Sequence, residues 1–173
     1  MWMLIGELMR ARTREYLASS SLSPEEMPGL RPPATPAQLE KLEALAGQPL
    51  DPDYRKFLSL TDGLDGFQHS MPLLGCRDWE DAERKGLASM FCDIVLETGP
   101  LAEAALPEET RVAPVYVNAD GTVGVLMLHH GDDALERFWW SGEGDNMFFH
   151  TFCDLVTYIT DGSYSPRHLA GDA

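Results

Sequence analysis

Two pairs of neighbouring residues, His129-His130 and Asp132-Asp133, have side-chain types that bind transition metals. Neighbouring residues of a strand point to opposite faces, so the two histidines cannot bind one ion together. One histidine would meet Asp132 and Asp120 only across a hairpin, and that arrangement does not match the usual closed ligand sets. We therefore interpret the segment as an exposed acidic turn, and we expect neither a metal nor a cofactor.

The three cysteines, Cys76, Cys92 and Cys153, are candidates for a covalent nucleophile. A reactive thiolate needs a basic neighbour that lowers its pKa, and the surroundings of these cysteines are acidic. No G-x-S-x-G pattern is present, and carboxylate pairs such as Asp62 and Asp65 are expected by chance among 28 acidic residues. We expect structural thiols and a protein that is not an enzyme. An odd number of cysteines without C-x-x-C spacing is typical of a reduced, cytoplasmic compartment.

The tryptophan pair Trp139-Trp140 is followed by an acidic loop that contains Glu143 and Asp145. Alternation in a strand sends one indole inward and the other outward. An outward tryptophan beside acidic residues resembles a binding hot spot with a polar rim. The alternative is that helices cover both faces of the strand and that both rings belong to the core.

The net charge of the chain is −15, from 13 basic and 28 acidic residues among 173. The charges of residues 1–34 cancel, so the excess lies in residues 35–173. Such a surface repels nucleic acids and anionic membranes and attracts a basic protein partner. The acidic candidates for partner binding are Asp51, Asp53, Asp62, Asp65, Asp132, Asp133, Glu143 and Asp145.

The first segment of the chain is predicted to be an amphipathic helix. An acidic residue interrupts its apolar run and no small-residue cleavage site follows, so we do not expect an export signal. One helical face carries Trp2, Ile5, Leu8, Met9 and Arg12. We expect this face to pack on its own chain, and the alternative is a homodimer contact. Residues 1–34 therefore comprise this helix and a connection rich in Ser and Pro, and residues 35–173 form the main part of a single globular unit.

Two further helices are predicted between Thr35 and Gly63. Thr35 is a favourable N-cap for the first, which should end at Gly47, and Asp51 is the N-cap of the second, which Gly63 should close. The apolar residues that share one face are Leu39, Leu42, Leu45 and Ala46 in the first helix and Tyr54, Phe57 and Leu58 in the second.

The rest of the chain is predicted to form strands between two helices. Its expected elements are a weak strand over 68–74, a helix over 79–95 that Asp78 caps and Gly86 interrupts, strands over 112–117, 122–128 and 134–140, a loop over 141–145, and a closing helix that Thr151 and Asp154 cap. The first two of the later strands should form a hairpin through residues 118–121. The fold class is α+β, with the helices packed on an antiparallel or mixed sheet of about four to six strands.

Several of these motifs, taken together, resemble the SUKH superfamily. The motifs are Leu50-Asp51-Pro52-Asp53-Tyr54, Phe57-Leu58 and Asp62-Gly63, then Val112-Ala113-Pro114, Asp120-Gly121 and the start of the closing helix from Thr151 to Leu155. The proline of the first motif stands one place later than in the usual pattern. The resemblance covers residues 35–161 and leaves the first 34 residues outside it.

The resemblance implies a non-enzymatic immunity protein that neutralises a cognate bacterial toxin by direct binding. Many toxins of this kind are nucleases with basic nucleic-acid-binding sites, which an acidic protein can occlude. The alternative that the superfamily implies is an intracellular regulatory or scaffold protein, as in its fungal regulator of cell-wall synthesis. We expect no nucleic-acid or membrane partner.

Overall fold

The computed structural model describes residues 1–19, 23–97, 101, 104, 106–131, 135–142 and 145–169. Its helices are α1 (Trp2–Ala18), α2 (Pro36–Ala46), α3 (Pro52–Leu58), α4 (Ala82–Glu97) and α6 (Phe152–Asp161), with the 3-10 turns η1 (Pro24–Glu26) and η2 (Cys76–Trp79). Its strands are β1 (Gly29–Leu30), β2 (Leu64–Gln68), β3 (Met71–Leu73), β4 (Arg111–Val117), β5 (Gly124–His129), β6 (Phe138–Gly142), β7 (Asp145–Phe149) and β8 (Arg167–His168).

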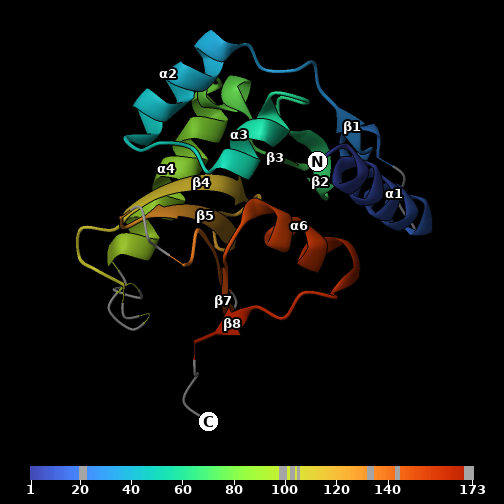
Figure 1. Cartoon of the computed structure of the whole chain (residues 1–173). Coiled ribbons are helices and arrows are strands. Elements are labelled where there is room, and N and C mark those ends of the chain that lie inside the picture. The colour runs from blue at the N-terminus through green and yellow to red at the C-terminus, as the bar shows by residue number, and fades with distance from the viewer. Residues whose placement is uncertain are drawn as a thin grey trace.

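These strands form two antiparallel sheets, and the helices pack around them, so the predicted α+β class is confirmed (Figure 1). One sheet has the order β1-β2-β3 and the other the order β4-β5-β6-β7-β8. Within each sheet, every described strand therefore pairs with its neighbour in the sequence. The amide of Leu74 donates to the carbonyl of Val115 at 2.8 Å, which ties the end of the small sheet to the large one.

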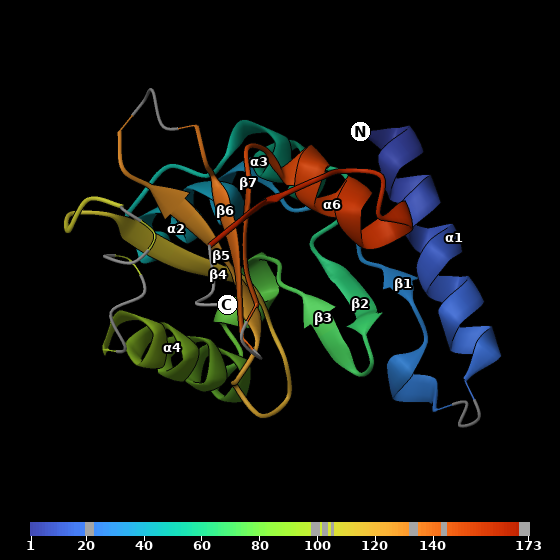
Figure 2. The same ribbon diagram turned by 90° about the horizontal axis from the view of Figure 1, so that it is seen from below.

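The two faces of the five-stranded sheet carry separate hydrophobic clusters. Val125 and Met127 of β5 point into the cluster that α3 and α6 help to form, whereas Leu126 and Leu128 point into the cluster that includes α4. Figure 2 shows α4 and α6 on opposite sides of the sheet. The covered faces explain why β5 is apolar at nearly every position, as its sequence predicts.

The predicted N-caps are confirmed at three helices. Thr35 of α2 and Thr151 of α6 each form a capping box, with Gln38 and Asp154 respectively. The carboxylate of Asp51 accepts hydrogen bonds from the first amides of α3. These interactions lie within four residues of one another in the sequence, which is why the local pattern is enough to predict them.

Two predictions for the same segment are wrong. The second helix ends at Leu58, not at Gly63. Gly63 has a φ of 82° in the turn before β2, where an added Cβ would lie 2.4 Å from the carbonyl oxygen of Leu73. Leu45 is 45 % exposed and is not part of the core, although Leu42 on the same helix is buried.

The middle of the chain also differs from the prediction. The helix expected from residue 79 begins at Ala82, after a separate turn that contains Asp78. Its N-terminus is capped by Asp81, whose carboxylate accepts from the amide of Arg84 at 2.9 Å. Gly86 does not interrupt the helix, because a single glycine lowers helix stability without breaking the hydrogen-bond pattern.

The strand predictions need several corrections. The strand expected over 68–74 is a hairpin, because β2 ends at Gln68 and β3 begins at Met71. The strand expected from residue 134 begins at Phe138, and the loop expected over 141–145 overlaps the ends of β6 and β7. β7 itself was not predicted. Neither were the two-residue strands β1 and β8.

The first helix packs on its own chain, as expected. Ile5 and Leu8 are buried in the larger hydrophobic cluster, and α1 lies beside α6 in both overall views. The predicted buried face is too wide, because Trp2 is 62 % exposed. Met3 and Leu17 are exposed as well, and the homodimer contact stays a prediction.

Candidate functional site

Two of the acidic residues predicted to bind a partner are buried, and that prediction is wrong for them. Asp51 is 4 % exposed, and its Oδ1 accepts from the amides of Asp53 at 3.0 Å and Tyr54 at 3.1 Å. Asp62 is 5 % exposed and accepts from the amide of Cys76 at 2.6 Å. Both carboxylates satisfy backbone donors, so they are unavailable to a partner.

Asp65 belongs to a buried ion network. Arg31 donates to the carboxylate of Asp65 at 2.6 Å and to that of Asp78 at 2.5 Å, and the side chains of Arg31 and Asp78 are each 1 % exposed. Arg77 also pairs with Asp65 at 3.1 Å, and Arg84 pairs with Asp78. The network joins the segment after β1 to β2, η2 and α4. Asp65 is therefore neutralised by two arginines rather than offered to a partner.

The pKa values of this network follow from its contacts. Burial alone would raise the pKa of Asp65, but the hydrogen bond and charge of Arg31 outweigh it and lower the pKa. Burial alone would lower the pKa of Arg31, and its hydrogen bonds to Asp65 and Asp78 raise it instead. Each group thus stabilises the charged form of the other.

The other predicted acidic residues do not form a described cluster. Asp53 is half-buried on α3, and its carboxylate adds to the effect of burial in raising the pKa of Cys153. Three of the candidates, Asp132, Asp133 and Glu143, lie outside the described residues, and so does the side chain of Asp145, whose backbone starts β7.

The two tryptophans lie on opposite faces of β6, as the alternation predicts. Trp139 is fully buried, stacks on Phe148 and donates its indole N–H to Oδ1 of Asn146 at 2.9 Å. It is a core residue, so its predicted role in partner binding is wrong. Trp140 is half-buried, packs against Tyr116 and faces a cavity.

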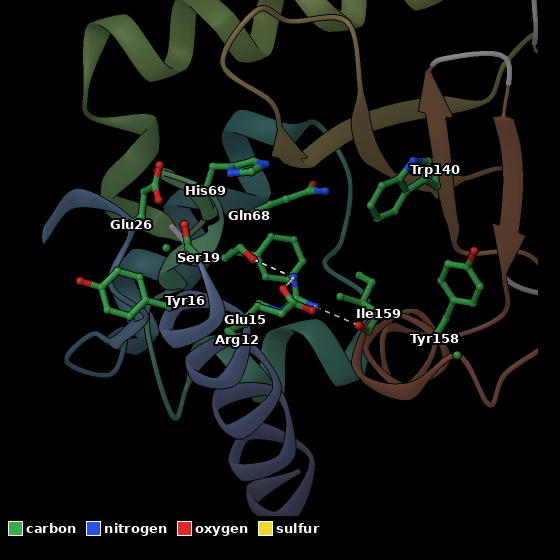
Figure 3. Close-up of a pocket in the computed structure, with 13 residues that line it drawn as sticks. Arg12, Glu15, Tyr16, Ser19, Glu26, Gln68, His69, Trp140, Tyr158 and Ile159 are labelled. Carbon is green, nitrogen blue, oxygen red and sulfur yellow. Dashed lines mark hydrogen bonds and ion pairs between the residues drawn. The ribbon is translucent and has the colours of Figure 1, made fainter. Parts of the chain in front are cut away.

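This cavity, which we call the α1–α6 pocket, has a volume of about 540 Å³. That volume lies within the range of small-molecule and peptide side-chain sites. The residues that line it come from α1, η1, the β2–β3 hairpin, β6 and α6, and Figure 3 shows Arg12, Glu15, Tyr16, Ser19, Glu26, Gln68, His69, Trp140, Tyr158 and Ile159 around it.

Arg12 connects three of the elements that line the α1–α6 pocket, namely α1, β2 and α6. Its guanidinium donates to the carbonyl of Phe67 at 3.3 Å and to that of Ile159 at 3.0 Å, and it pairs with Glu15 at 2.9 Å. The guanidinium also lies 5.9 Å from the centre of the Phe67 ring. Only 10 % of the side chain is exposed. The sequence places Arg12 on the packing face of α1, and the structure shows that it links α1 to β2 and α6.

The β2–β3 hairpin places polar groups around the same cavity. His69 at its turn has a φ of 53°, and no other non-glycine residue in the described ranges has a positive φ. Gly66 lets η1 approach the hairpin, since an added Cβ would lie 2.4 Å from the carbonyl oxygen of Glu26. The Oε1 atom of Gln68 is buried and has no hydrogen-bond donor among the described residues. Strained backbone and unsatisfied polar atoms are features that cluster at binding sites.

Most residues of the α1–α6 pocket were missed by sequence reasoning. Only Arg12 and Trp140 were singled out there, as an amphipathic-face residue and as a candidate hot spot. Glu26 and His69 stand in segments without periodicity, where no local pattern marks them. The one available signal was the tryptophan that alternation sends outward.

A second feature is an acidic stripe along α4 with apolar side chains in its middle. We call it the α4 face, and its exposed residues are Glu83, Met90, Asp93, Ile94 and Glu97. Their spacing of three, four and seven residues puts them on one side of the helix. None of the three carboxylates forms an ion pair with another described residue.

The cysteines have the properties expected of structural thiols. Burial raises the pKa of Cys76 and Cys92 to about 12 and that of Cys153 to about 11, so the reactive thiolate is scarce at neutral pH. Across the described ranges, no three His, Cys, Asp or Glu side chains are placed to hold a metal ion. In the same ranges no helix is long and apolar enough to span a bilayer.

No protein-family model matches the chain, and no curated protein matches it either. The fold itself defines the class, which is an α+β domain of two antiparallel sheets with a pocket beside its first helix.

Proposed function

We propose that this protein is a non-enzymatic binding module whose acidic surface binds a basic protein partner. We further propose that it is a divergent member of the SUKH superfamily and acts as an immunity protein, with a basic toxin domain, such as a nuclease, as its partner. The motif pattern from Leu50 to Leu155 supports the membership. The net charge of −15 supports the sign of the partner.

The observation that carries this proposal is the α4 face. Met90 and Ile94 present exposed apolar surface, and Glu83, Asp93 and Glu97 surround it with carboxylates that pair with no other described residue. An apolar centre with a charged rim is the usual composition of a protein interface. Exposed charges of one sign also accelerate the encounter with a partner of opposite sign.

The test is to measure complex formation with the toxin domain encoded beside this chain. Reversing two acidic residues of the α4 face, with Asp93→Lys and Glu97→Lys together, should slow association by about tenfold or more at low salt. The matched control, Glu7→Lys with Glu40→Lys, changes the charge equally on the exposed surfaces of α1 and α2 and should have a much smaller effect.

Co-expression gives the functional readout. The wild-type chain should protect cells from the toxin domain, and the α4 variant should protect them less. Absence of both protection and a complex at low salt would refute the immunity role. Capture of a conserved cellular protein, with no toxin encoded nearby, would instead favour an intracellular regulator of the same fold.

A further inference from the structure

We propose that the α1–α6 pocket binds an arginine side chain of the basic partner. This inference rests on the proposed function, because it names the group through which the partner is recognised. Glu26, Gln68 and Trp140 all line this cavity (Figure 3).

The charged and polar groups of the pocket favour a cation with several N–H donors. The carboxylate of Glu26 forms no ion pair with any described residue, and the Oε1 atom of Gln68 accepts from no donor among them. The terminal amide torsion of glutamine is broad and roughly two-fold, so the amide can turn its oxygen toward a ligand. A guanidinium offers five N–H donors and no acceptor, which matches this lining.

The aromatic lining favours a planar cation. Trp140 is half-buried with part of its ring at the cavity, and Tyr158 lies on the same side in Figure 3. Guanidinium groups stack on aromatic faces more readily than ammonium groups do. The fold already uses this contact, since Arg167 lies 4.2 Å from the centre of the Phe148 ring.

An anionic ligand fits the pocket poorly, although Arg12 lines it. The guanidinium of Arg12 is already bound by the carbonyls of Phe67 and Ile159 and by Glu15. Of its five N–H donors, only the buried Nε–H lacks an acceptor among the described residues, so Arg12 has no free pair of donors to offer to a phosphate or carboxylate. With this charge compensated, Glu26 makes the pocket attractive to cations.

The surroundings allow one partner to reach both proposed surfaces. In both overall views the β2–β3 hairpin, whose turn carries His69, lies between α4 and α1. A partner that covers the α4 face can thus extend a basic segment across this turn into the α1–α6 pocket.

The direct test uses a blocked pentapeptide with a central arginine between glycines. Its binding should shift the indole N–H signal of Trp140 in a ¹H–¹⁵N spectrum, and Trp140→Phe assigns that signal among the four tryptophans. Twin peptides with citrulline, which is isosteric and neutral, or with lysine should bind at least about fivefold more weakly. Equal binding of the arginine and citrulline peptides, or shifts confined to residues outside the pocket, would overturn the proposal.

Variants of the protein complete the test. Glu26→Gln and Trp140→Leu should each weaken binding of the arginine peptide by about tenfold. Glu40→Gln, a control on the exposed side of α2, should leave it unchanged. Glu26→Gln removes a half-buried, unpaired charge, so it keeps the fold even if Trp140→Leu does not.

Comparison with the α4 variant separates the two proposals. If the partner still binds Glu26→Gln and Trp140→Leu normally but not the Asp93→Lys, Glu97→Lys variant, the arginine site is refuted and the proposed function stands. If no basic partner binds any form of the chain while the arginine peptide binds the pocket, the proposed function fails and the arginine site is retained.

Discussion

Replacing Arg31 with methionine tests whether the buried ion network holds the small sheet, η2 and α4 together. The change keeps an apolar stem of similar length and removes the charge that faces Asp78, whose side chain is 1 % exposed. Removing one partner of a buried pair costs about 3–5 kcal/mol. The exposed half of the network adds little, because Asp65 is 43 % exposed. Arg84 still pairs with Asp78, so we expect the lower end of that range, about 3 kcal/mol.

The assay is urea unfolding followed by circular dichroism, with a thermal melt as a second measurement. A loss of about 3 kcal/mol should lower the melting temperature by roughly 6–12 °C in a chain of this size. Arg77→Met is the matched control, because Arg77 makes a single exposed contact with Asp65, and it should cost less than about 1 kcal/mol.

A second substitution separates the buried charge from lost packing. Adding Asp78→Asn to the Arg31→Met variant removes the buried carboxylate, which Arg84 alone then pairs, and should recover about 1 kcal/mol or more. The reasoning would be refuted if Arg31→Met and Arg77→Met cost the same, or if the second substitution made the protein still less stable.

Three further predictions concern stability. His69→Gly should leave the free energy of unfolding unchanged or raise it by up to about 1 kcal/mol in urea titration, because glycine accepts the positive φ. Leu42→Ala should cost about 2–5 kcal/mol and Leu45→Ala less than about 1, since only the first is buried; equal losses would contradict the assigned faces. Asp65→Asn should make the free energy of unfolding fall less steeply with acid below pH 3.8. The reason is that Arg31 lowers the pKa of Asp65 in the folded state. The stabilisation by the Asp65 carboxylate is therefore present above pH 3.8 and is lost as the pH drops through that lowered pKa.

The parts of the fold that the sequence predicted are those set by neighbouring residues. The caps at Thr35, Asp51 and Thr151 each use amides two or three positions away. The β4–β5 hairpin is likewise local, and Gly121 has the positive φ that its turn requires. The strand β8 has two residues and exists only because β7 offers a pairing edge, so no local pattern could indicate it.

The acidic residues of the candidate site show the same limit of prediction from neighbouring residues. Asp62 and Asp65 look like surface charges in the sequence, and a high negative charge makes that interpretation natural. The pairing of Asp65 depends on Arg31, which lies 34 positions before it, and the carboxylate of Asp62 is occupied by the turn around Cys76. A carboxylate can be judged free or committed only when such distant partners are known.

The α4 face and the α1–α6 pocket are suited to different parts of one binding event. The carboxylates of the α4 face are exposed, so salt screens them strongly, and their main effect is on the rate of encounter. Glu26 and Trp140 are half-buried, and a guanidinium bound in the pocket that they line would be screened less. Binding there should therefore act mainly on the lifetime of the complex, since dissociation governs most affinity differences. An acidic surface alone attracts many basic proteins, whereas a pocket that requires a planar cation in one place selects among them.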